Sequence, residues 1–172
     1  DIIDNLSQEK KLNAIWLSGG EPLLRNDIVD ICRRISKKGI KPSLSTNGVL
    51  LTPKLIRDLH DAGVDYILIE TCIEIQEMRA ALLAAKDACN LPVICQLSFS
   101  EDGRTVTGTD PQSAAIILEA MGADIIGANC SLGPEQLVPI IKELADNCSC
   151  PISVQANAGM PHLENGQTIF PL

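Results

Sequence analysis

The chain has 172 residues, a formal net charge of −8, and 45% hydrophobic, 21% charged and only 2% aromatic residues. This balance predicts one soluble globular domain, residues 1–172, with a core of aliphatic side chains. The acidic charge and scarce aromatic rings argue against a nucleic-acid-binding surface, and no apolar run reaches the roughly 18 residues of a membrane span.

Short apolar runs alternate with amphipathic segments along the whole chain. The amphipathic segments have apolar residues at helical spacing, whereas the apolar runs are continuous, as in strands that are covered on both faces. In chain order we expect the end of a helix within 1–11, a strand at 14–17, a helix at 26–38, a strand at 42–45, a helix at 53–62, a strand at 66–69, a helix at 74–89, a strand at 93–97, a helix at 111–121, a strand at 125–128, a helix at 135–147, a strand at 152–155 and a loop-like tail at 156–172.

Strand and helix recur at roughly 25–30 residues, the length of one βα unit, which predicts a parallel sheet covered by helices. Two architectures have this pattern, a (βα) barrel and an open doubly wound sheet. Small, polar or glycine-rich loops follow every strand, as the top of a barrel requires, whereas an open sheet would gather them at one switch point. These loops are SGGEP (18–22), STNG (45–48), ETC (70–72), SFSEDG (98–103), NCSLGP (129–134) and NAGMP (157–161).

The number of strands limits how far such a barrel closes. Six strands are predicted, whereas a complete barrel has eight, in typically about 250 residues. We therefore predict an α/β fold of the TIM-barrel type, a partial barrel of about six parallel strands with outer helices. Its two open edges favour a homodimer or a covering helix, because an unpaired edge strand tends to pair with another chain unless it is covered.

The cysteines indicate the cellular compartment of the chain, and the first residue indicates how the chain was produced. The seven cysteines lack the even framework of a small secreted protein, and no signal peptide is evident. We therefore expect a reducing, cytoplasmic setting. The chain begins with Asp1 rather than Met, which predicts a processed or excised segment.

Residues 1–65 contain a glycine-rich loop within WLSGGEP (16–22), followed by STNG (45–48). This region resembles the core of the radical S-adenosylmethionine enzymes. The resemblance implies that Gly19, Gly20, Glu21 and Pro22 contact the methionine end of that cofactor. Glycines allow the backbone to approach a ligand closely, and a carboxylate can stabilise an ammonium group. The alternative is an ordinary βα turn in which Glu21 lies near the next helix start.

The same family holds an iron–sulfur cluster through three cysteines spaced C-x3-C-x2-C. That spacing does not occur in this chain, so we do not expect a cluster or the radical chemistry that depends on it. Cys32 lies at an apolar position of a predicted helix and is expected to be part of the core.

Residues 66–172 carry a second set of motifs. These are IETCIEIQEMRAALLAAK (69–86), GRTVTGTDP (103–111), GANCSLGP (127–134) and NAGMP (157–161). They resemble the homocysteine-binding barrel of cobalamin-dependent methionine synthases and related homocysteine S-methyltransferases. The resemblance implies that Glu70 holds the amino acid's ammonium group, that Asn129 and Asn157 contact the substrate, and that Cys130 is one of three thiolate ligands to zinc.

Zinc in that family lowers the pKa of the homocysteine thiol and so produces the nucleophile for methyl transfer. The other two ligands are an adjacent Cys-Cys pair, which this sequence lacks. Cys72 and His162 both follow predicted strands, so they are candidate replacements on the face of Cys130. The remaining cysteines are expected to pack in the protein rather than to bind metal. Cys89 ends a predicted helix, Cys95 lies within a predicted strand, and Cys148 and Cys150 precede a predicted strand.

The two resemblances meet within AGVDYILIET (62–71), which predicts a chimera of a radical-enzyme half and a methyltransferase half. Three functions remain open. The chain is a chimeric or designed partial-barrel scaffold without complete catalysis, a fragment of a zinc-dependent homocysteine S-methyltransferase, or a small-molecule module that binds S-adenosylmethionine or homocysteine.

Overall fold

The computed structural model describes residues 2–6, 12–159 and 161–169, and all structural statements refer to these residues. The elements are α1 (Ile2–Leu6), β1 (Ala14–Leu17), the 3₁₀ helix η1 (Pro22–Leu24), α2 (Ile28–Ser36), β2 (Lys41–Thr46), α3 (Pro53–Asp61), β3 (Ile67–Cys72), α4 (Ile75–Ala88), β4 (Val93–Leu97), α5 (Pro111–Ala120), β5 (Ile125–Asn129), α6 (Pro134–Asp146), β6 (Ile152–Gln155), β7 (His162–Glu164) and β8 (Gln167–Ile169).

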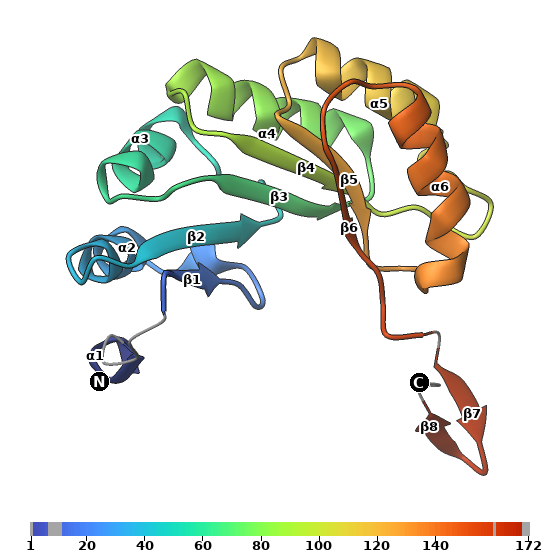
Figure 1. Ribbon diagram of the computed structural model, residues 1–172, viewed down its shortest axis with the longest axis horizontal. Coiled ribbons are helices and arrows are strands. Elements are labelled where there is room, and N and C mark those ends of the chain that lie inside the picture. Colours follow the sequence, from blue (N-terminus) through green and yellow to red (C-terminus); the bar gives the residue numbers. More distant parts are fainter. Residues whose placement is uncertain (1, 7–11, 160, 170–172) are drawn as a thin grey trace.

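Six of the strands form one parallel sheet in the order β1-β2-β3-β4-β5-β6, so that each strand lies beside its neighbour in sequence. Figure 1 shows that this sheet curves into a half-barrel with α2 to α6 on its outer side. The predicted α/β partial barrel of six parallel strands with outer helices is therefore confirmed. β1 and β6 are its two edge strands.

Local sequence signals define where several helices begin. The Thr52 hydroxyl accepts a hydrogen bond from the Leu55 backbone N–H, and the Asp110 carboxylate accepts one from Ser113 N–H. Each of these caps is followed by proline, Pro53 or Pro111, whose missing N–H costs nothing in the first helical turn. The predicted helix starts at these two sites are accurate for this reason.

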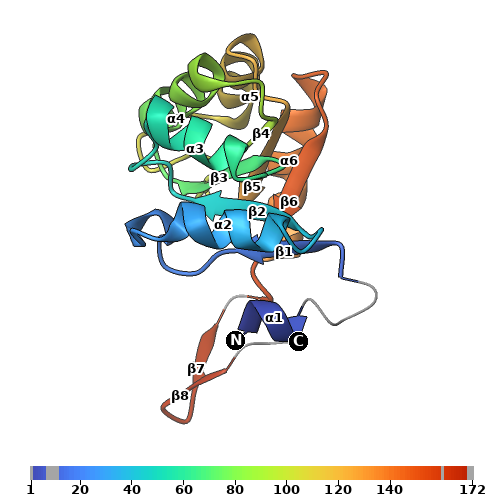
Figure 2. The ribbon, with the colours of Figure 1, turned by 90° about the vertical axis from the view of Figure 1, so that its left-hand side faces the viewer.

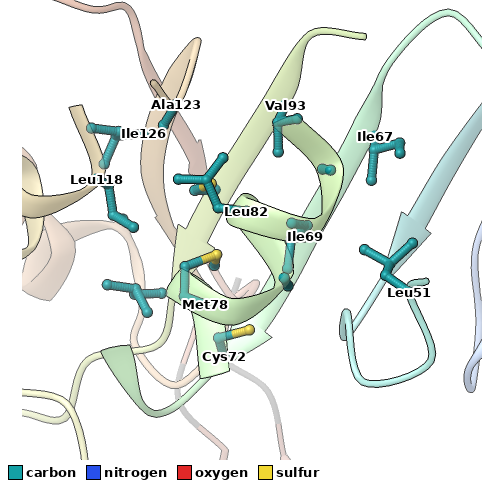
Figure 3. Close-up of a cluster of buried hydrophobic side chains, with 14 of the residues drawn as sticks. Leu51, Ile67, Ile69, Cys72, Met78, Leu82, Val93, Leu118, Ala123 and Ile126 are labelled. Atoms are coloured by element: carbon teal, nitrogen blue, oxygen red, sulfur yellow. The ribbon is translucent and has the colours of Figure 1, made fainter. Parts of the chain in front are cut away.

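The hydrophobic core fills the space between the convex side of the sheet and the helices. Figure 3 shows Ile67, Ile69 and Cys72 of β3 pointing toward Met78 and Leu82 of α4. All five side chains are buried. Aliphatic residues dominate this layer, as the scarcity of aromatic residues predicts. The core continues from the first half of the chain into the second without a break.

The tail differs from the sequence-based expectation. Residues 156–172 were expected to be loop-like, but β7 and β8 within them form an antiparallel hairpin. Its turn is Asn165-Gly166, and both residues have positive φ, 50° and 77°. This dipeptide suits a two-residue hairpin turn, because Asn and Gly tolerate the left-handed conformation that such turns require. Figures 1 and 2 both show the hairpin lying away from the half-barrel, whereas α1 is held near α2 by ion pairs of Asp4 with Arg34 at 3.0 Å and Lys38 at 2.9 Å.

The boundary between the two matched motif sets lies between β2 and β3, which pair in regular parallel register. Asp65 N–H donates to the Pro42 carbonyl at 3.2 Å, and Lys41 Nζ lies 2.9 Å from Asp65 Oδ2. Gly48, at φ 82°, packs so closely that a Cβ there would lie 2.8 Å from Ala81 Cβ. The two halves are thus packed as one sheet. Within the described residues, no helix has the length and apolar character needed to cross a membrane.

Candidate functional site

The candidate site lies at the carboxyl ends of the strands, on the concave side of the half-barrel. Two adjoining cavities of ≈ 240 and ≈ 320 Å³ share Ser45 and Glu70. The smaller is also lined by Trp16, Ser18 and Gln155, and the larger by Gly20, Thr46, Asn47 and Thr71. The carboxyl ends of barrel strands are where ligand sites are built, because the loops converge there. We call this region the mouth.

Glu70 lies at the junction of the two cavities. Its Oε1 accepts a hydrogen bond from the Ser45 hydroxyl, which is buried on the neighbouring strand β2. The Glu70 side chain itself is half-buried. One carboxylate oxygen is therefore fixed by the protein while the group still faces the cavities, and a fixed carboxylate of this kind suits a cationic ligand group.

A β-bulge in β3 orients this part of the mouth. Ile69 pairs with Cys95 and Cys72 pairs with Leu97, so Glu70 and Thr71 together oppose a single residue, Gln96. Thr71 has a positive φ of 60°, a strained conformation for a β-branched residue. Because side chains alternate along a strand, the extra residue turns the residues after Glu70 to the opposite face of the sheet. Cys72 consequently points outward into the core.

Thr71 is held by Asn129 from the end of β5. Asn129 Oδ1 accepts from Thr71 N–H at 3.0 Å, and Asn129 Nδ2 donates to Thr71 Oγ1 at 2.8 Å. The same Nδ2 lies 3.4 Å from Cys130 Sγ, and Thr71 Oγ1 lies 3.8 Å from that sulfur. Asn129 is buried and Cys130 half-buried. The thiol is therefore set among polar groups at the edge of the mouth.

The backbone at Cys130 is strained in the same way. Cys130 and Ser131 have positive φ values of 56° and 58°. Cys130 N–H donates to the Gln155 carbonyl at 3.0 Å, and the Ser98 hydroxyl donates to the Asn129 carbonyl at 3.0 Å. Non-glycine residues keep such a conformation only where the surroundings enforce it, and these conformations concentrate at functional sites. The strain supports a functional role for this turn.

Glu21 is engaged by the protein itself. Its Oε1 accepts from Leu23 N–H at 2.9 Å and from Thr46 Oγ1 at 2.7 Å, while Oε2 accepts from Asn47 N–H at 2.8 Å. The carboxylate therefore ties the loop after β1 to the loop after β2 and caps η1. This arrangement matches the alternative of a structural turn, and the predicted contact of Glu21 with a cofactor stays a prediction.

The other residues predicted to contact the cofactor lie beside Glu21 in the loop after β1. Gly19 and Gly20 have positive φ values of 96° and 55°, and among the described residues nothing beyond their chain neighbours comes within 4 Å of where their Cβ atoms would be. Pro22 is buried as the first residue of η1. Gly20 thus leaves open space along the larger cavity. The predicted role of Gly19, Gly20 and Pro22 in cofactor binding stays a prediction.

The predicted substrate and metal residues are not all gathered at the mouth. The Cys72 thiol is buried and donates to the Asn47 carbonyl at 3.6 Å. Burial raises the pKa of Cys72 to about 12, with a smaller contribution from Glu77. Asn157 is half-buried, and its backbone N–H donates to the Leu132 carbonyl at 3.0 Å. The side chain of His162 lies outside the described part of the structure.

Zinc, which the second resemblance implies, requires several donors around Cys130. Among the described residues, no group of three or more His, Cys, Asp or Glu side chains is placed to hold a metal ion. The neighbours of the Cys130 sulfur are a hydroxyl and an amide N–H, which are poor zinc ligands. The described residues therefore do not fit a complete zinc site.

Two polar residues of the mouth were not singled out in advance. Ser45 and Thr71 lie within the quoted motifs STNG and IETC, but their importance depends on which strands are neighbours and on the bulge. Two features of the sequence could have pointed to these residues. Thr71 directly follows Glu70, which the resemblance implies to bind the ligand, and Ser45 is the last residue of a predicted strand.

Comparisons with known proteins place the chain in a family. The homocysteine S-methyltransferase family matches residues 50–170, and the Radical SAM superfamily matches residues 1–70. Because the first match covers well over half of the chain, the chain belongs to the homocysteine S-methyltransferase family. The two matches follow one another and share only residues 50–70, which fits a chimera of the two.

Individual relatives agree with this division. Methionine synthase of Mycobacterium tuberculosis is 32% identical over 117 residues, which are 65% of this chain and 10% of that protein. AdoMet-dependent heme synthase of Methanosarcina barkeri is 50% identical over 48 residues, 28% of this chain and 14% of that protein. The chain therefore spans only about a tenth of the length of these methionine synthases.

Solved structures resemble the fold. Apo homocysteine methyltransferase MmuM of Escherichia coli has a TM-score of 0.62 at 13% identity, covering 89% of this chain and 68% of that one. The carboxyl transferase domain of Rhizobium etli pyruvate carboxylase has a TM-score of 0.66 at 16% identity, covering 90% of this chain and 31% of that one. At these identities the likeness shows the barrel-type fold alone.

Proposed function

We propose that the chain is a chimera of a radical-enzyme segment and a homocysteine S-methyltransferase segment, and that its mouth binds a homocysteine-like amino acid. The observation that carries this proposal is the position of Glu70 at the junction of two cavities, fixed by Ser45 on the neighbouring strand. In this account the chain is a binding module on a partial-barrel scaffold.

The ammonium end of the ligand is assigned to Glu70. A zwitterionic amino acid carries a positive ammonium group, and a half-buried carboxylate is screened less by water than a surface carboxylate. Ser45 holds one oxygen of Glu70 and leaves lone pairs for a ligand. Ammonium–carboxylate hydrogen bonds are among the stronger ones in proteins.

The sulfur end is assigned to the side of Cys130. Thr71 follows Glu70 directly and its hydroxyl lies 3.8 Å from Cys130 Sγ, so the two ends of the mouth are a short distance apart. Asn129 positions Thr71 through two hydrogen bonds and lies against the Cys130 sulfur through Nδ2. A ligand with an ammonium group and a thiol on a short aliphatic chain matches this order of groups.

Isothermal titration of the reduced chain with L-homocysteine tests this assignment. We expect saturable binding that Glu70→Gln weakens at least about tenfold, the loss of one good ion pair with a ligand. Glu101→Gln, an exposed carboxylate in the loop after β4, is the matched control and should bind like the wild type. 4-Mercaptobutyrate, which lacks the amino group, should bind weakly to both.

Two results would count against binding at the mouth. The absence of saturable heat at millimolar L-homocysteine would leave the scaffold without a ligand function. Equal affinities for the wild type and Glu70→Gln would remove Glu70 from the site.

A second candidate is binding of S-adenosylmethionine, favoured by Gly20 along the larger cavity. The same calorimeter experiment with this ligand tests it. Gly20→Val should abolish this heat, because its side chain would enter the larger cavity, and circular dichroism checks that the fold tolerates valine at the positive φ of this position. Equal heats for the wild type and Gly20→Val would remove this candidate.

A further inference from the structure

The single tryptophan of the chain, Trp16, lies on the concave side of the half-barrel and lines the smaller cavity of the mouth. It belongs to the edge strand β1, where the next residue, Leu17, packs against the core. Because side chains alternate along a strand, Trp16 points to the opposite face, and 47% of it is exposed. An exposed ring gives up the stabilisation that its burial would supply. The position of Trp16 therefore points to contact with a ligand rather than to packing.

Tyr66 fixes the orientation of the Trp16 ring. The two rings meet edge to face, with centroids 5.8 Å apart and planes at 83°. Tyr66 immediately precedes β3, and Trp16 pairs with Ser43 on β2, the strand between them. Such contacts are favourable, because the positive edge of one ring meets the negative face of the other. The indole ring is therefore held in place before a ligand arrives.

Trp16 and Glu70 line the same small cavity, of ≈ 240 Å³, together with the uncharged side chains of Ser18, Ser45 and Gln155. Its volume is below the roughly 300–1,000 Å³ of typical ligand pockets, so it suits one end of a ligand rather than a whole one. Among the described residues of its lining, Glu70 is the only charged one. A cavity with one carboxylate and one aromatic ring favours a positively charged group.

We propose that Trp16 is a specificity-determining residue of the mouth, and that its ring holds the ammonium group of the ligand in the cavity that it shares with Glu70. An aromatic ring attracts a cation through the negative charge over its face, and tryptophan does so most strongly. The inference rests on the proposed binding of a homocysteine-like amino acid and adds an orientation to it. The ammonium end enters the smaller cavity, and the aliphatic chain runs past Thr71 toward Cys130.

This orientation divides the ligand between the two matched segments. Trp16 lies in the segment matched by the Radical SAM superfamily alone, whereas Thr71 and Cys130 lie in the segment matched by the methyltransferase family alone. A ligand without an ammonium group loses its contacts with both Trp16 and Glu70. The ring of Trp16 therefore contributes to the selection of a cationic over a neutral or anionic ligand.

Fluorinated tryptophan at position 16 tests the role of the ring face with little change in its shape. Because the chain has one tryptophan, biosynthetic incorporation of 5-fluoro- or 5,6-difluorotryptophan alters this position alone. Fluorine draws negative charge away from the ring face, so the affinity of the full reduced chain for L-homocysteine should fall stepwise with each fluorine in isothermal titration. Trp16→Leu should weaken binding about tenfold, and Trp16→Phe should weaken it less.

The control ligand is 4-mercaptobutyrate, which lacks the ammonium group, and its weak binding should not change along the fluorinated series. The emission of Trp16 is a second measurement that needs no variant. It should change on addition of L-homocysteine and saturate at the same concentration as the heat. Circular dichroism checks the folding of Trp16→Leu and Trp16→Phe, and the fluorinated series remains decisive if either variant fails to fold.

Failure of this inference is distinguishable from failure of the proposed function. The absence of saturable heat from the unmodified chain at millimolar L-homocysteine overturns the proposed function and this inference with it. Binding that Glu70→Gln weakens, but that is equal across the fluorinated series, overturns the role of Trp16 alone. An unchanged Trp16 emission at saturating L-homocysteine has the same consequence.

Discussion

The Ser45 hydroxyl on β2 donates a hydrogen bond to Oε1 of Glu70 on β3, across the boundary between the two motif sets. Ser45 lies in the segment matched by the Radical SAM superfamily alone, whereas Glu70 is the last of the residues 50–70 that both families match. The two strands pair in regular register around this contact. The mouth thus contains a polar contact between the Radical SAM-matched segment and the end of the region that both families match.

Removal of the Ser45 hydroxyl is expected to destabilise the chain. Ser45→Ala leaves the half-buried Glu70 oxygen without its donor, which costs about 1–3 kcal/mol of the free energy of unfolding. Ser43→Ala is the matched control, because Ser43 is equally buried two residues earlier on the same face of β2. Urea denaturation measures both. Equal losses in the two variants would show that the contact with Glu70 contributes nothing.

Gly127 is expected to accept no side chain. A Cβ at Gly127 would lie 1.9 Å from the Ser153 carbonyl oxygen on β6, so the edge strand would have to move. Gly127→Ala should lower the free energy of unfolding by about 3 kcal/mol or more, as overpacking against backbone does.

Gly133→Ala is the control for this substitution. Gly133 has an ordinary φ of −77°, and its added Cβ would come close to the flexible end of Gln136, with Gly159 Cα at an ordinary contact distance of 3.8 Å. Thermal denaturation should separate the two variants clearly. A Gly127→Ala protein as stable as Gly133→Ala would mean that β6 is not held in this position.

Glu21 is expected to act through stability before any role in binding. Glu21→Gln replaces one acceptor oxygen by an NH₂ group facing donors, and three hydrogen bonds depend on that carboxylate. The expected loss is about 1–3 kcal/mol. Glu143→Gln, an exposed carboxylate on α6, should change the stability little. If Glu21→Gln has wild-type stability in urea, the tie between the two loops is not a stabilising contact.

Asp124 is expected to make stability depend on pH. Burial alone would raise its pKa, but hydrogen bonds from Lys86 Nζ at 2.5 Å and Val93 N–H at 2.7 Å outweigh burial and lower it. A lowered pKa in the folded state means that the stabilisation is present above the unfolded pKa of about 4 and is lost as the pH falls through the folded value.

Urea denaturation between pH 7 and pH 2.5 checks this expectation. The wild type should exceed Asp124→Asn by about 1 kcal/mol near neutral pH, because the group is partly exposed, and the difference should shrink below about pH 4. Asp87→Asn, an exposed aspartate on α4, should follow the wild-type profile. A difference that is constant with pH would contradict the assignment to Asp124.

Much of the fold follows from local signals. Apolar runs locate β4 and β6 at the predicted residues, 93–97 and 152–155, and Thr52-Pro53 and Asp110-Pro111 locate helix starts. The hairpin in the tail was missed although Asn165-Gly166 is a strong turn signal, because the strands beside it are only three residues long.

The amino-acid sequence alone determined the βα repeat, the parallel sheet, the two families and the candidate residues Glu70 and Cys130, because these depend on periodicity and on contiguous motifs. Only the tertiary structure decided which side chains meet. The bulge at Glu70–Thr71 turns Cys72 into the core, Asn129 reaches Thr71 across 58 positions of sequence, and Ser45 is brought to Glu70 by strand pairing. Each of these depends on register and long-range packing, which a local pattern does not encode.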